Sequence, residues 1–520
     1  MSRLSNIWQA VRGQSSTPVS TKQSHLRGFA AAGLDRMTAN WVATEASINR
    51  ELQGDLNRLR ARGRQLVKDN DFARKFKGMV SDNIIGPDGV RYQSRVFDKP
   101  DTPDRLANNA IELAWAKWKK VADVTGRADF DSMCRNAVGG MPSDGEFLWQ
   151  IVTGPDAGNP FNFAIQNIDV DRIDTQFNGT YNNNTVIMGV EVNTYRRPLA
   201  LHIFAAHPSD GARSSRERVR IPAENLIHYY AQEYADQVRG IPWMTPGMLS
   251  LHHLGGFMLS ALQAAEHGAN HYGFFETKEG ATPPSGDSQD VSGNAITTSV
   301  PGFYDTLPEG VTHSSFDSRY PNEVFAPFTK TILQRIASGW RINYTSLSND
   351  LLGVSYNSIR TGTIEERDRW KVDQQHFINA VMERIQPVWL KMALLSGQIA
   401  MSNGSPLPAS KFDKFAAHEW QPRRWEWVDP LNDMNAKILA VNGGFIPPQD
   451  IASDMGYDFD DVIVKIATAK KLAAALGVSL PAYDSKPGAN SDKQGDKAGD
   501  ANKPAGDVKP TKDTANNTAK

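Results

Sequence analysis

The sequence predicts an α+β protein in which long helices accompany a separate region of short strands. Three observations lead to this class. Apolar residues recur at helical spacing in several long segments. Between residues 145 and 230, short β-rich runs alternate with Gly, Asn, Pro and Asp, which is typical of strands joined by turns. From Met244 to Phe275 the only charged residue is Glu266, and such a helix is usually buried on several sides.

Composition limits the possible functions. The chain has 520 residues, 40 % hydrophobic and 22 % charged, which allows a large core. A formal net charge of −1 gives no overall basic signal for nucleic acid. The single cysteine, Cys134, excludes an intrachain disulfide and argues against a cysteine-based zinc site. No apolar run reaches the roughly 18 residues of a membrane span, and the polar N-terminus does not resemble a secretory signal.

The first half of the chain predicts helices followed by strands. From Arg50 to Asp69, leucines form one stripe and arginines occupy much of the remaining surface; this fits a solvated face, or a basic surface near DNA or a neighbouring subunit. A second helix is expected from Asp104 to Ala122, with Trp115 and Trp118 on it. Four strands are then predicted, at Phe147–Val152, Thr185–Val192, Leu199–Phe204 and Leu226–Tyr230.

The second half is mainly helical. Thr245 and Pro246 look like the N-cap and first residue of the charge-poor helix. Another helix is expected over Phe325–Leu347, and the polar stretch Ser348–Tyr356 interrupts the pattern.

A long helix then runs from Ser358 to Leu395, roughly 55 Å at 1.5 Å per residue, with a kink expected at Pro387. Small helices are predicted at Met434–Val441, Pro448–Met455 and Asp460–Leu476. Residues 485–520 are low in complexity and almost without large aliphatic side chains, so we expect them to be disordered.

Motifs for catalysis are scarce. The sequence has no G-x-x-x-x-G-K-[ST] phosphate loop, no G-x-S-x-G elbow and no H-E-x-x-H zinc helix. His267 and His271 have metal-binding spacing but no evident third ligand. Asp169, Asp171 and Asp174 form a cluster that is common in turns but could hold a divalent ion. Cys134 lies in a helical-looking segment and fits a buried structural role. We therefore expect no catalytic residue, no cofactor and no metal.

A series of short motifs occurs in order along residues 30–480: Arg36–Trp41, Asn83–Gly86, Asp144-Gly145-Glu146, Arg239–Pro242, Leu352–Arg360, Trp425–Pro430 and Gly456–Asp458. Their order and spacing resemble the lambda family of tailed-bacteriophage portal proteins. The most specific is Leu352–Arg360, which is similar to the family's G-x-S-Y-S-S-x-R stretch ahead of a long charged helix. The sequence departs from the family at Asn357, where Ser is usual, and in the tail beyond residue 485.

The resemblance implies a portal fold with wing, two-helix stem, clip, tunnel loop, long kinked wing helix and helical crown. The segments would be a flexible N-terminal arm (1–25), wing (26–242), stem helix (243–273), clip (274–322), second stem helix (323–347), tunnel loop (348–356), long wing helix and following segment (357–429), crown (430–483) and disordered tail (484–520).

The resemblance also implies a function without catalysis. Family members form a ring, usually of twelve subunits, at one capsid vertex, through which double-stranded DNA is packaged and ejected. The implied partners are the terminase large subunit as separate motor, the major capsid and scaffold proteins, and a head–tail connector or adaptor, with no membrane. The implied location is the virion, and the host cytoplasm during assembly. The candidate DNA-channel residues are Asn349, Asp350, Leu351, Leu352, Gly353, Lys330, Arg335 and Arg341.

Two alternatives remain open from the residues alone. One is a metal-dependent phage nuclease that uses Asp169, Asp171 and Asp174. The other is an adaptor or scaffold protein without a channel. The three channel cations could instead pair with acids on adjacent subunits.

Overall fold

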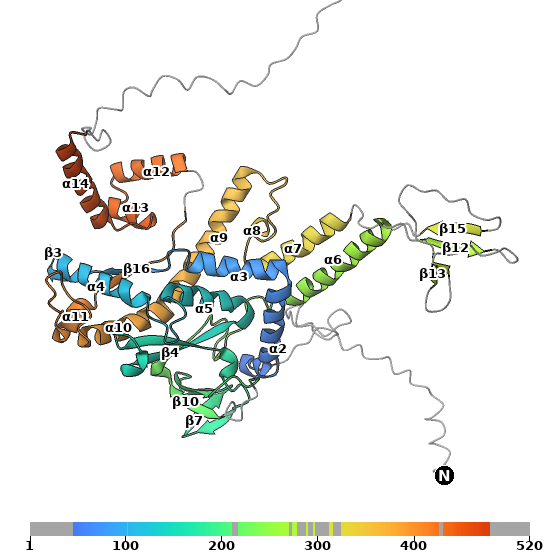
Figure 1. Ribbon diagram of the computed structural model, residues 1–520, viewed down its shortest axis with the longest axis horizontal. Coiled ribbons are helices and arrows are strands. Elements are labelled where there is room, and N and C mark those ends of the chain that lie inside the picture. The colour runs from blue at the N-terminus through green and yellow to red at the C-terminus, as the bar shows by residue number, and fades with distance from the viewer. Residues whose placement is uncertain are drawn as a thin grey trace, which may run out of the picture.

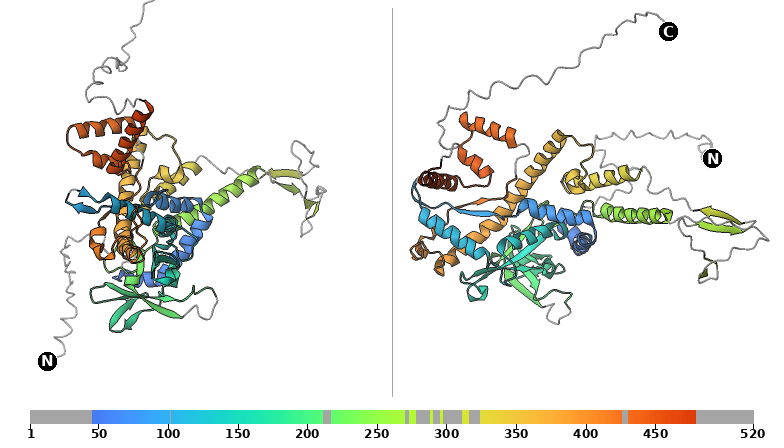
Figure 2. Two further views of the ribbon diagram at one scale, coloured as in Figure 1. Left: turned by 60° about the vertical axis from the view of Figure 1, so that its left-hand side comes forward. Right: turned by 45° about the horizontal axis from the view of Figure 1, so that its top comes forward.

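A computed structural model describes residues 45–100, 102–210, 217–269, 273–277, 288–289, 295–296, 311–315, 324–425 and 430–478. Figure 1 shows a central body, a pair of helices (α6 and α7) that projects from it, and three C-terminal helices on the opposite side. The other views in Figure 2 show the same projection. The predicted N-terminal arm, most of the predicted clip and the predicted C-terminal tail lie outside the described residues.

The body begins with two helices that share a cap. Helix α2 (Ile48–Asp69) agrees with the prediction. Asn70 follows it and caps helix α3 (Asp71–Ile84), because its side chain accepts hydrogen bonds from the backbone N–H groups of Phe72 and Ala73. Helix α3 was not predicted. Helix α4 (Arg105–Lys119) confirms the second predicted helix.

Helix α5 (Phe130–Asp144) contains Cys134 and ends at Gly145, whose φ of +76° is left-handed. At this position a Cβ would lie 2.2 Å from the backbone carbon of Ile241. Only glycine fits such a close approach, so the turn from α5 into the sheet depends on this residue.

Two antiparallel sheets make up the β-rich region. The three-stranded sheet has the order β11-β4-β5, and β4 pairs Leu148 with Ile168 and Gln150 with Leu226. The five-stranded sheet has the order β10-β9-β8-β7-β6. The strands are β4 (Glu146–Thr153), β5 (Phe163–Ile168), β6 (Gly179–Tyr181), β7 (Asn184–Ile187), β8 (Val190–Val192), β9 (Pro198–Phe204), β10 (Arg218–Pro222) and β11 (Leu226–Tyr230).

Three of the four predicted strands are confirmed, and the fourth is a hairpin. The run Thr185–Val192 folds back on itself as β7 and β8, with Thr185 opposite Val192. Met188 and Gly189 both have positive φ, +46° and +81°. This is the backbone of a tight two-residue hairpin turn. The β-rich pattern continues through the turn, so the sequence predicted one strand where the chain forms two.

Helices α6 (Met248–Ala269) and α7 (Phe325–Gly339) form the projection. The prediction that Thr245 caps α6 was wrong. The Thr245 hydroxyl donates instead to the Pro242 carbonyl at 2.6 Å, and Gly247 has a φ of +98°, so the helix starts at Met248 and not at Pro246. Described strands beyond α6 are β12 (Gly273–Thr277), β13 (Ser288–Gln289), β14 (Ala295–Ile296) and β15 (Val311–Ser315).

The predicted single helix over Phe325–Leu347 is two helices. Helix α7 ends at Gly339, Arg341 is left-handed with a φ of +57°, and a short helix α8 (Tyr344–Ser348) follows. The break is held by Trp340, which is buried, stacks on Phe76 at 4.6 Å and donates from Nε1 to the Met244 carbonyl. Tertiary packing of this side chain therefore overrides the helical pattern.

The long predicted helix is confirmed and is made of three parts. Helix α9 (Tyr356–Phe377) is capped by Ser355, whose side chain accepts a hydrogen bond from the backbone N–H of Ser358. A π-helical turn, Ile378–Met382, joins it to helix α10 (Glu383–Leu395). Pro387 lies inside α10, just after the π-helical turn.

The remaining elements close the body and add the C-terminal helices. Strand β1 pairs with β16 although more than 300 residues separate them. The C-terminal helices, defined as residues 430–478, match the three predicted small helices. The elements are β1 (Arg91–Ser94), β2 (Phe97–Lys99), β3 (Thr102–Pro103), α11 (Phe412–Phe415), β16 (His418–Gln421), α12 (Pro430–Asn442), α13 (Pro448–Asp454), α14 (Phe459–Leu476) and 3₁₀ turns at Pro155–Ala157, Val170–Arg172, Ala223–Asn225 and Ala409–Lys411.

The main core is aromatic and joins α4, α10 and the β1–β16 pair. Trp115 lies 4.8 Å from both Trp118 and Trp389, and 5.0 Å from Tyr92. Trp118 and Trp389 are fully buried. None of the described helices is long and apolar enough to span a bilayer.

Truncation of this cluster should destabilise the body. We expect Trp389→Ala to cost about 3–5 kcal/mol, because a fully buried indole leaves a cavity. The measurement is thermal and denaturant unfolding. Tyr195→Ala, at a residue 90 % exposed, is the control and should change stability by less than about 0.5 kcal/mol. Equal effects of the two changes would contradict the assignment of this core.

Candidate channel loop and buried charge network

The candidate channel loop, residues 349–355, connects α8 to α9 (Figure 1). Asn349 takes a left-handed conformation, φ +58°, which ends α8. The Nζ of Lys75, on α3, donates to the side-chain oxygen of Asn349. The predicted interruption between two helices is therefore present, and the role of the loop at DNA stays a prediction.

Asp350 holds the loop to α7 and α8. Its carboxylate accepts hydrogen bonds from Lys330 Nζ at 3.1 Å, the Tyr344 hydroxyl at 3.0 Å and the Leu352 backbone N–H at 3.1 Å. The Leu352 N–H, together with Lys330 and Tyr344, lowers the pKa of the Asp350 carboxyl below its ordinary value. The loop's one charge is thus compensated within its own subunit.

The tip of the loop is apolar and exposed. Leu351 is 62 % exposed and Leu352 is 85 % exposed. Gly353 follows with a φ of +71°. A loop of this kind can contact a passing surface by shape, because it presents neither a row of cations nor a row of hydrogen-bond donors.

The three candidate cations do not form one patch. Lys330 pairs with Asp350 of the same chain at 3.1 Å. Arg335 is exposed five residues further along α7, which turns it about 140° around the helix from Lys330. Arg341 is exposed at the break after α7, and its backbone carbonyl accepts from Arg369 at 3.0 Å. The sequence did not predict the Lys330–Asp350 pair.

A buried carboxylate, Glu146, connects two of the motifs quoted above. It begins β4 and its side chain is fully buried. It accepts hydrogen bonds from Arg239 (2.6 Å), from Arg60 on α2, and from the Gly240 backbone N–H (2.7 Å), and lies 2.9 Å from the Nε2 of His228. Asp144-Gly145-Glu146 and Arg239–Pro242 thus meet at one ion-pair network.

The charges of this network depend on one another. Burial alone would raise the pKa of Glu146, but Arg239, Arg60 and His228 lower it well below its ordinary value. Gly240 lets the segment before α6 approach the end of α5 this closely, since a Cβ there would lie 2.1 Å from the Gly145 carbonyl oxygen. The network is structural: it joins α2, β4, β11 and the segment that leads to α6.

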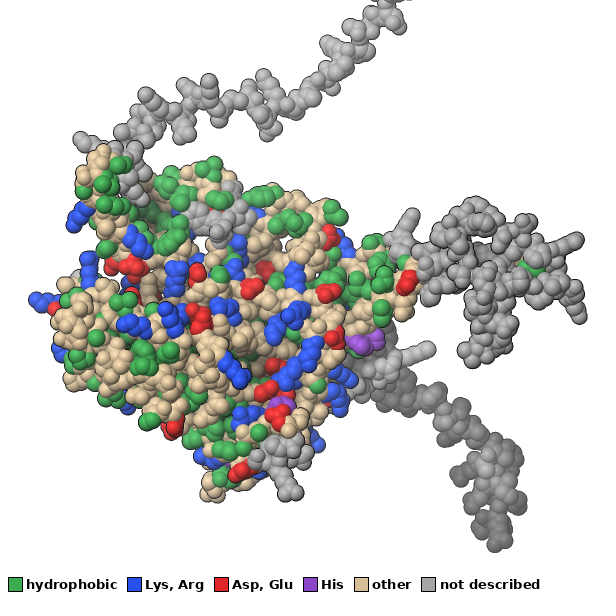
Figure 3. Space-filling view, viewed as in Figure 1, with side chains coloured by type: hydrophobic (Ala, Val, Ile, Leu, Met, Phe, Trp, Pro, Cys, Tyr) green, Lys and Arg blue, Asp and Glu red, His purple; other side chains and the backbone are tan. Residues whose placement is uncertain are grey.

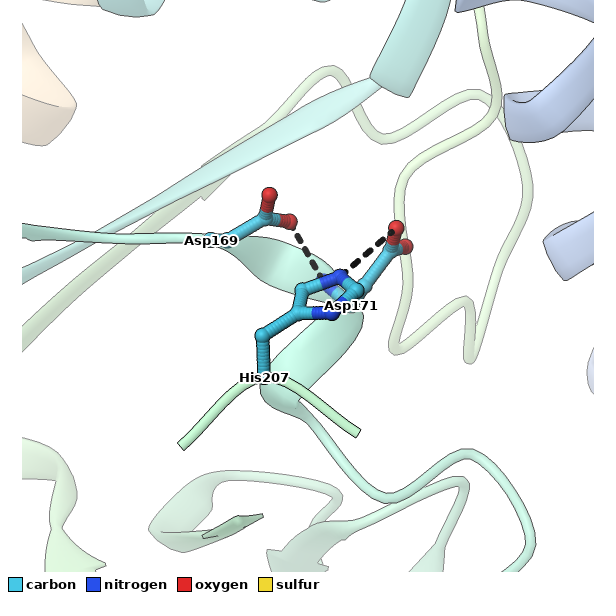
Figure 4. Close-up of side chains that lie close together, drawn as sticks. All are labelled: Asp169, Asp171 and His207. Carbon is cyan, nitrogen blue, oxygen red and sulfur yellow. Dashed lines mark hydrogen bonds and ion pairs between the residues drawn. The ribbon is translucent and has the colours of Figure 1, made fainter. Parts of the chain in front are cut away.

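The acidic residues considered for a metal are already paired. Asp169, Asp171 and His207 lie together, with candidate ligand atoms within 4.8 Å (Figure 4). Arg64 donates to Asp169 at 3.0 Å and to Asp171 at 2.5 Å.

Asp174, the third residue of the predicted cluster, is not part of that group. Its carboxylate binds Arg218 at 2.6 Å. The three carboxylates therefore do not converge, and arginines occupy the positions that a cation would take. Cys134 is buried, and burial raises the pKa of its thiol well above the ordinary value, which suits a structural residue. The side chains of His267 and His271 lie outside the described residues.

Comparisons with known proteins agree on one family. A family model described as "Phage portal protein, lambda family" matches residues 34–374. A "Probable portal protein" of Halomonas phage phiHAP-1 is 31 % identical over 495 residues, covering 92 % of this chain and 94 % of that protein. "Portal protein B" of Escherichia phage lambda is 18 % identical, covering 87 % and 90 %. A solved neck of an empty GTA particle is 12 % identical, covers 78 % of this chain and 93 % of that one, and has a TM-score of 0.42.

Removing the buried carboxylate should destabilise the protein strongly. Glu146→Gln leaves the buried guanidinium of Arg239 without its carboxylate partner and leaves Arg60 paired with Asp171 alone, and we expect a loss of about 3–5 kcal/mol in unfolding free energy. Denaturant unfolding measures it. Glu419→Gln is the matched control: its half-exposed carboxylate pairs with Arg95 at 3.0 Å, and the loss should stay below about 1 kcal/mol.

The same comparison has a pH dependence. The folded pKa of Glu146 is depressed from its ordinary 4.5, so the stabilisation is complete above that value and is lost as pH falls through the folded pKa. The wild-type advantage over Glu146→Gln should therefore persist at pH 7 and shrink below about pH 4. A gap that is independent of pH down to strongly acidic solution would contradict this role.

Proposed function

The chain belongs to the lambda family of phage portal proteins, and on this premise we propose that it is the subunit of a ring at one capsid vertex. Twelve copies would enclose a channel for duplex DNA during packaging and ejection, in the virion and, during assembly, in the host cytoplasm. A terminase large subunit would dock there as motor, and capsid, scaffold and head–tail connector proteins would contact the outside. The projection α6–α7 would be the stem and residues 430–478 the crown.

The observation that carries the ring is apolar surface that the described part of the chain leaves uncovered. An open groove along α6 is lined by Met258, Leu259, Ala261, Leu262, Ala265 and Phe325. Leu262 is 66 % exposed. On a projecting helix pair (Figure 1), such a surface is stable in water when neighbouring copies pack against it.

The C-terminal helices give a second, independent argument. No described residue of α12, α13 or α14 is buried, and Leu439 of α12, for example, is 71 % exposed. Polar contacts that join them to the body include Arg360–Asp433 at 2.8 Å and Arg95–Asp458 at 2.9 Å. A unit this small cannot build its own core, so neighbouring copies in a ring are expected to complete it.

The charge pattern suits a channel in which DNA slides. Each phosphate that a protein neutralises adds affinity through counterion release, so a row of free cations at the loop would hold DNA. In the candidate channel loop, Asp350 neutralises Lys330 of α7, and the tip is made of Leu351 and Leu352. The nuclease alternative is not favoured, because Arg64 already binds Asp169 and Asp171. An adaptor without a channel is distinguished by whether rings with a central hole form.

Ring formation should depend on the α6 groove. Leu262→Asp places a charge where a neighbouring copy would bury it without a partner, while the exposed position leaves the single subunit stable. We expect loss of rings by light scattering after size-exclusion chromatography and by negative-stain microscopy. Gln263→Asp, at an exposed polar neighbour on the same helix, should assemble normally. Normal rings from Leu262→Asp would overturn the stem assignment.

DNA passage should depend on the loop. Replacing residues 349–353 by two glycines should leave rings and proheads intact but impair packaging or retention of DNA. Protection of packaged DNA from nuclease in proheads carrying the mutant ring measures this. The double variant Leu351→Ser with Leu352→Ser keeps the loop length. It therefore tests whether packaging needs the apolar side chains at the tip or only a loop of this length. Wild-type packaging and retention by the shortened variant would refute the loop's role while leaving the ring intact.

A further inference from the structure

A cavity with a strong excess of positive charge lies between the body and the C-terminal helices. Its volume is about 490 Å³, and Arg91, Arg367, Arg423 and Arg424 line it. Among its described lining residues the one carboxylate is Asp88, which is exposed and pairs with Arg91 at 3.4 Å. The lining therefore holds four guanidinium groups and one exposed carboxylate, while Glu366 and Asp82, outside the lining, act on Arg367 and Arg423.

The arginines are held in position by the body. Arg367 and Arg423 both lie near Trp425, with guanidinium carbons 5.9 and 5.7 Å from the centroid of its ring. Arg423 donates to the Asp82 carbonyl and to the Asn83 side-chain oxygen. These contacts bring like charges together and fix their geometry before any ligand arrives.

The close approach has a measurable electrostatic consequence. Burial, and then the charge of Arg423, lower the pKa of Arg367 below its ordinary value. Burial also lowers the pKa of Arg423. Guanidinium groups nevertheless stay charged at neutral pH, so a bound anion would relieve this repulsion.

Arg424 offers a donor to that anion. Its Nε is buried, and within the part of the chain that the structure describes it has no hydrogen-bond acceptor. A buried N–H without an acceptor is costly. The residue is held in the segment that follows β16, where Gln374 Nε2 donates to the neighbouring Arg423 carbonyl at 3.1 Å.

We propose that this arginine cavity, lined by Arg91, Arg367, Arg423 and Arg424, binds the phosphodiester backbone of duplex DNA on the outside of the molecule. Guanidinium groups bind phosphate oxygens in a bidentate, charge-assisted way. Figure 3 shows Lys and Arg side chains, with Asp and Glu among them, on the face of the body below the C-terminal helices. Arg91, half exposed at the rim, would extend the contact to a further phosphate of the DNA backbone. A contact of this length suits a polymer of phosphates better than a single small ion.

The decisive experiment uses a covalently closed circular duplex, which cannot thread through a ring. Its binding therefore reports an external site alone, and failure here is distinguishable from failure of the proposed channel. We expect assembled wild-type protein to bind the circle with an affinity that falls as salt rises. Arg91→Gln with Arg424→Gln should weaken binding by ten-fold or more. The slope of log affinity against log salt should become shallower by about 0.9 for each phosphate that the variant no longer neutralises.

The matched control removes two charges elsewhere. Arg196→Gln with Arg197→Gln alters an exposed turn between β8 and β9, and should leave both affinity and slope near wild type. Equal reductions of affinity in the two double variants would mean diffuse electrostatic attraction and would overturn the site. Arg424→Lys keeps the charge but removes the planar guanidinium, so we expect an affinity for the circular duplex between those of wild type and Arg424→Gln. An unchanged thermal unfolding temperature would show that this variant is folded.

A small phosphate ligand is the other outcome that the chemistry allows. Calorimetric titration with inorganic phosphate at moderate salt tests it on the same variants. We expect weak phosphate binding that disappears in Arg424→Gln, alongside binding of the circle. If phosphate binds at this cavity but the circular duplex does not bind wild-type protein, the site takes a small anion and the DNA proposal is wrong. If neither binds, it is also wrong.

Discussion

Burial of one carboxylate, Glu146, is the constraint on which the rest of the structure depends. Its charge is stable away from water only because Arg60, Arg239 and the Gly240 N–H all reach it. These partners come from α2 and from the segment that leads into α6, and His228 adds a contact from β11. A single ion-pair network thus ties the N-terminal helices to the sheet and fixes the direction in which the projecting helices leave the body.

The body of the molecule is well packed, whereas the outer part of the projection and the C-terminal helices leave apolar side chains exposed. At the base of the projection, Trp340 stacks on Phe76 and donates a hydrogen bond to the Met244 carbonyl. These contacts attach the base of α6 and α7 to the body. Further out, Leu262 has no cover from the described chain, and the C-terminal helices have no buried residue among those described. A chain with a packed core at its centre and exposed apolar surface at its ends suits side-by-side assembly. Copies can then associate without a change in the fold of the body.

Local patterns in the sequence predicted the helices well and the tertiary features poorly. The long helix from Tyr356 to Leu395 was clear because its apolar stripe continues through the π-helical turn. The break at Arg341 was missed although α7 ends at Gly339, since the packing of Trp340 that holds the break is a tertiary contact. The β1–β16 pair was also missed, because its register is set by contacts more than 300 residues apart. Family motifs marked Glu146 and Arg239 but said nothing of their pairing, and the loop was located without its link to Lys330.

The distribution of charge separates two modes of DNA contact within one nearly neutral chain. At the candidate channel loop, Asp350 neutralises Lys330 and exposes two leucines, so phosphates find little to hold them. At the arginine cavity, the lining holds four guanidinium groups and one exposed carboxylate. Counterion release makes affinity rise with each phosphate that the protein neutralises, so on our two proposals the same polymer would slide past the first place and be retained at the second. A net charge near zero therefore does not argue against DNA as a partner, because local compensation decides where phosphate binds.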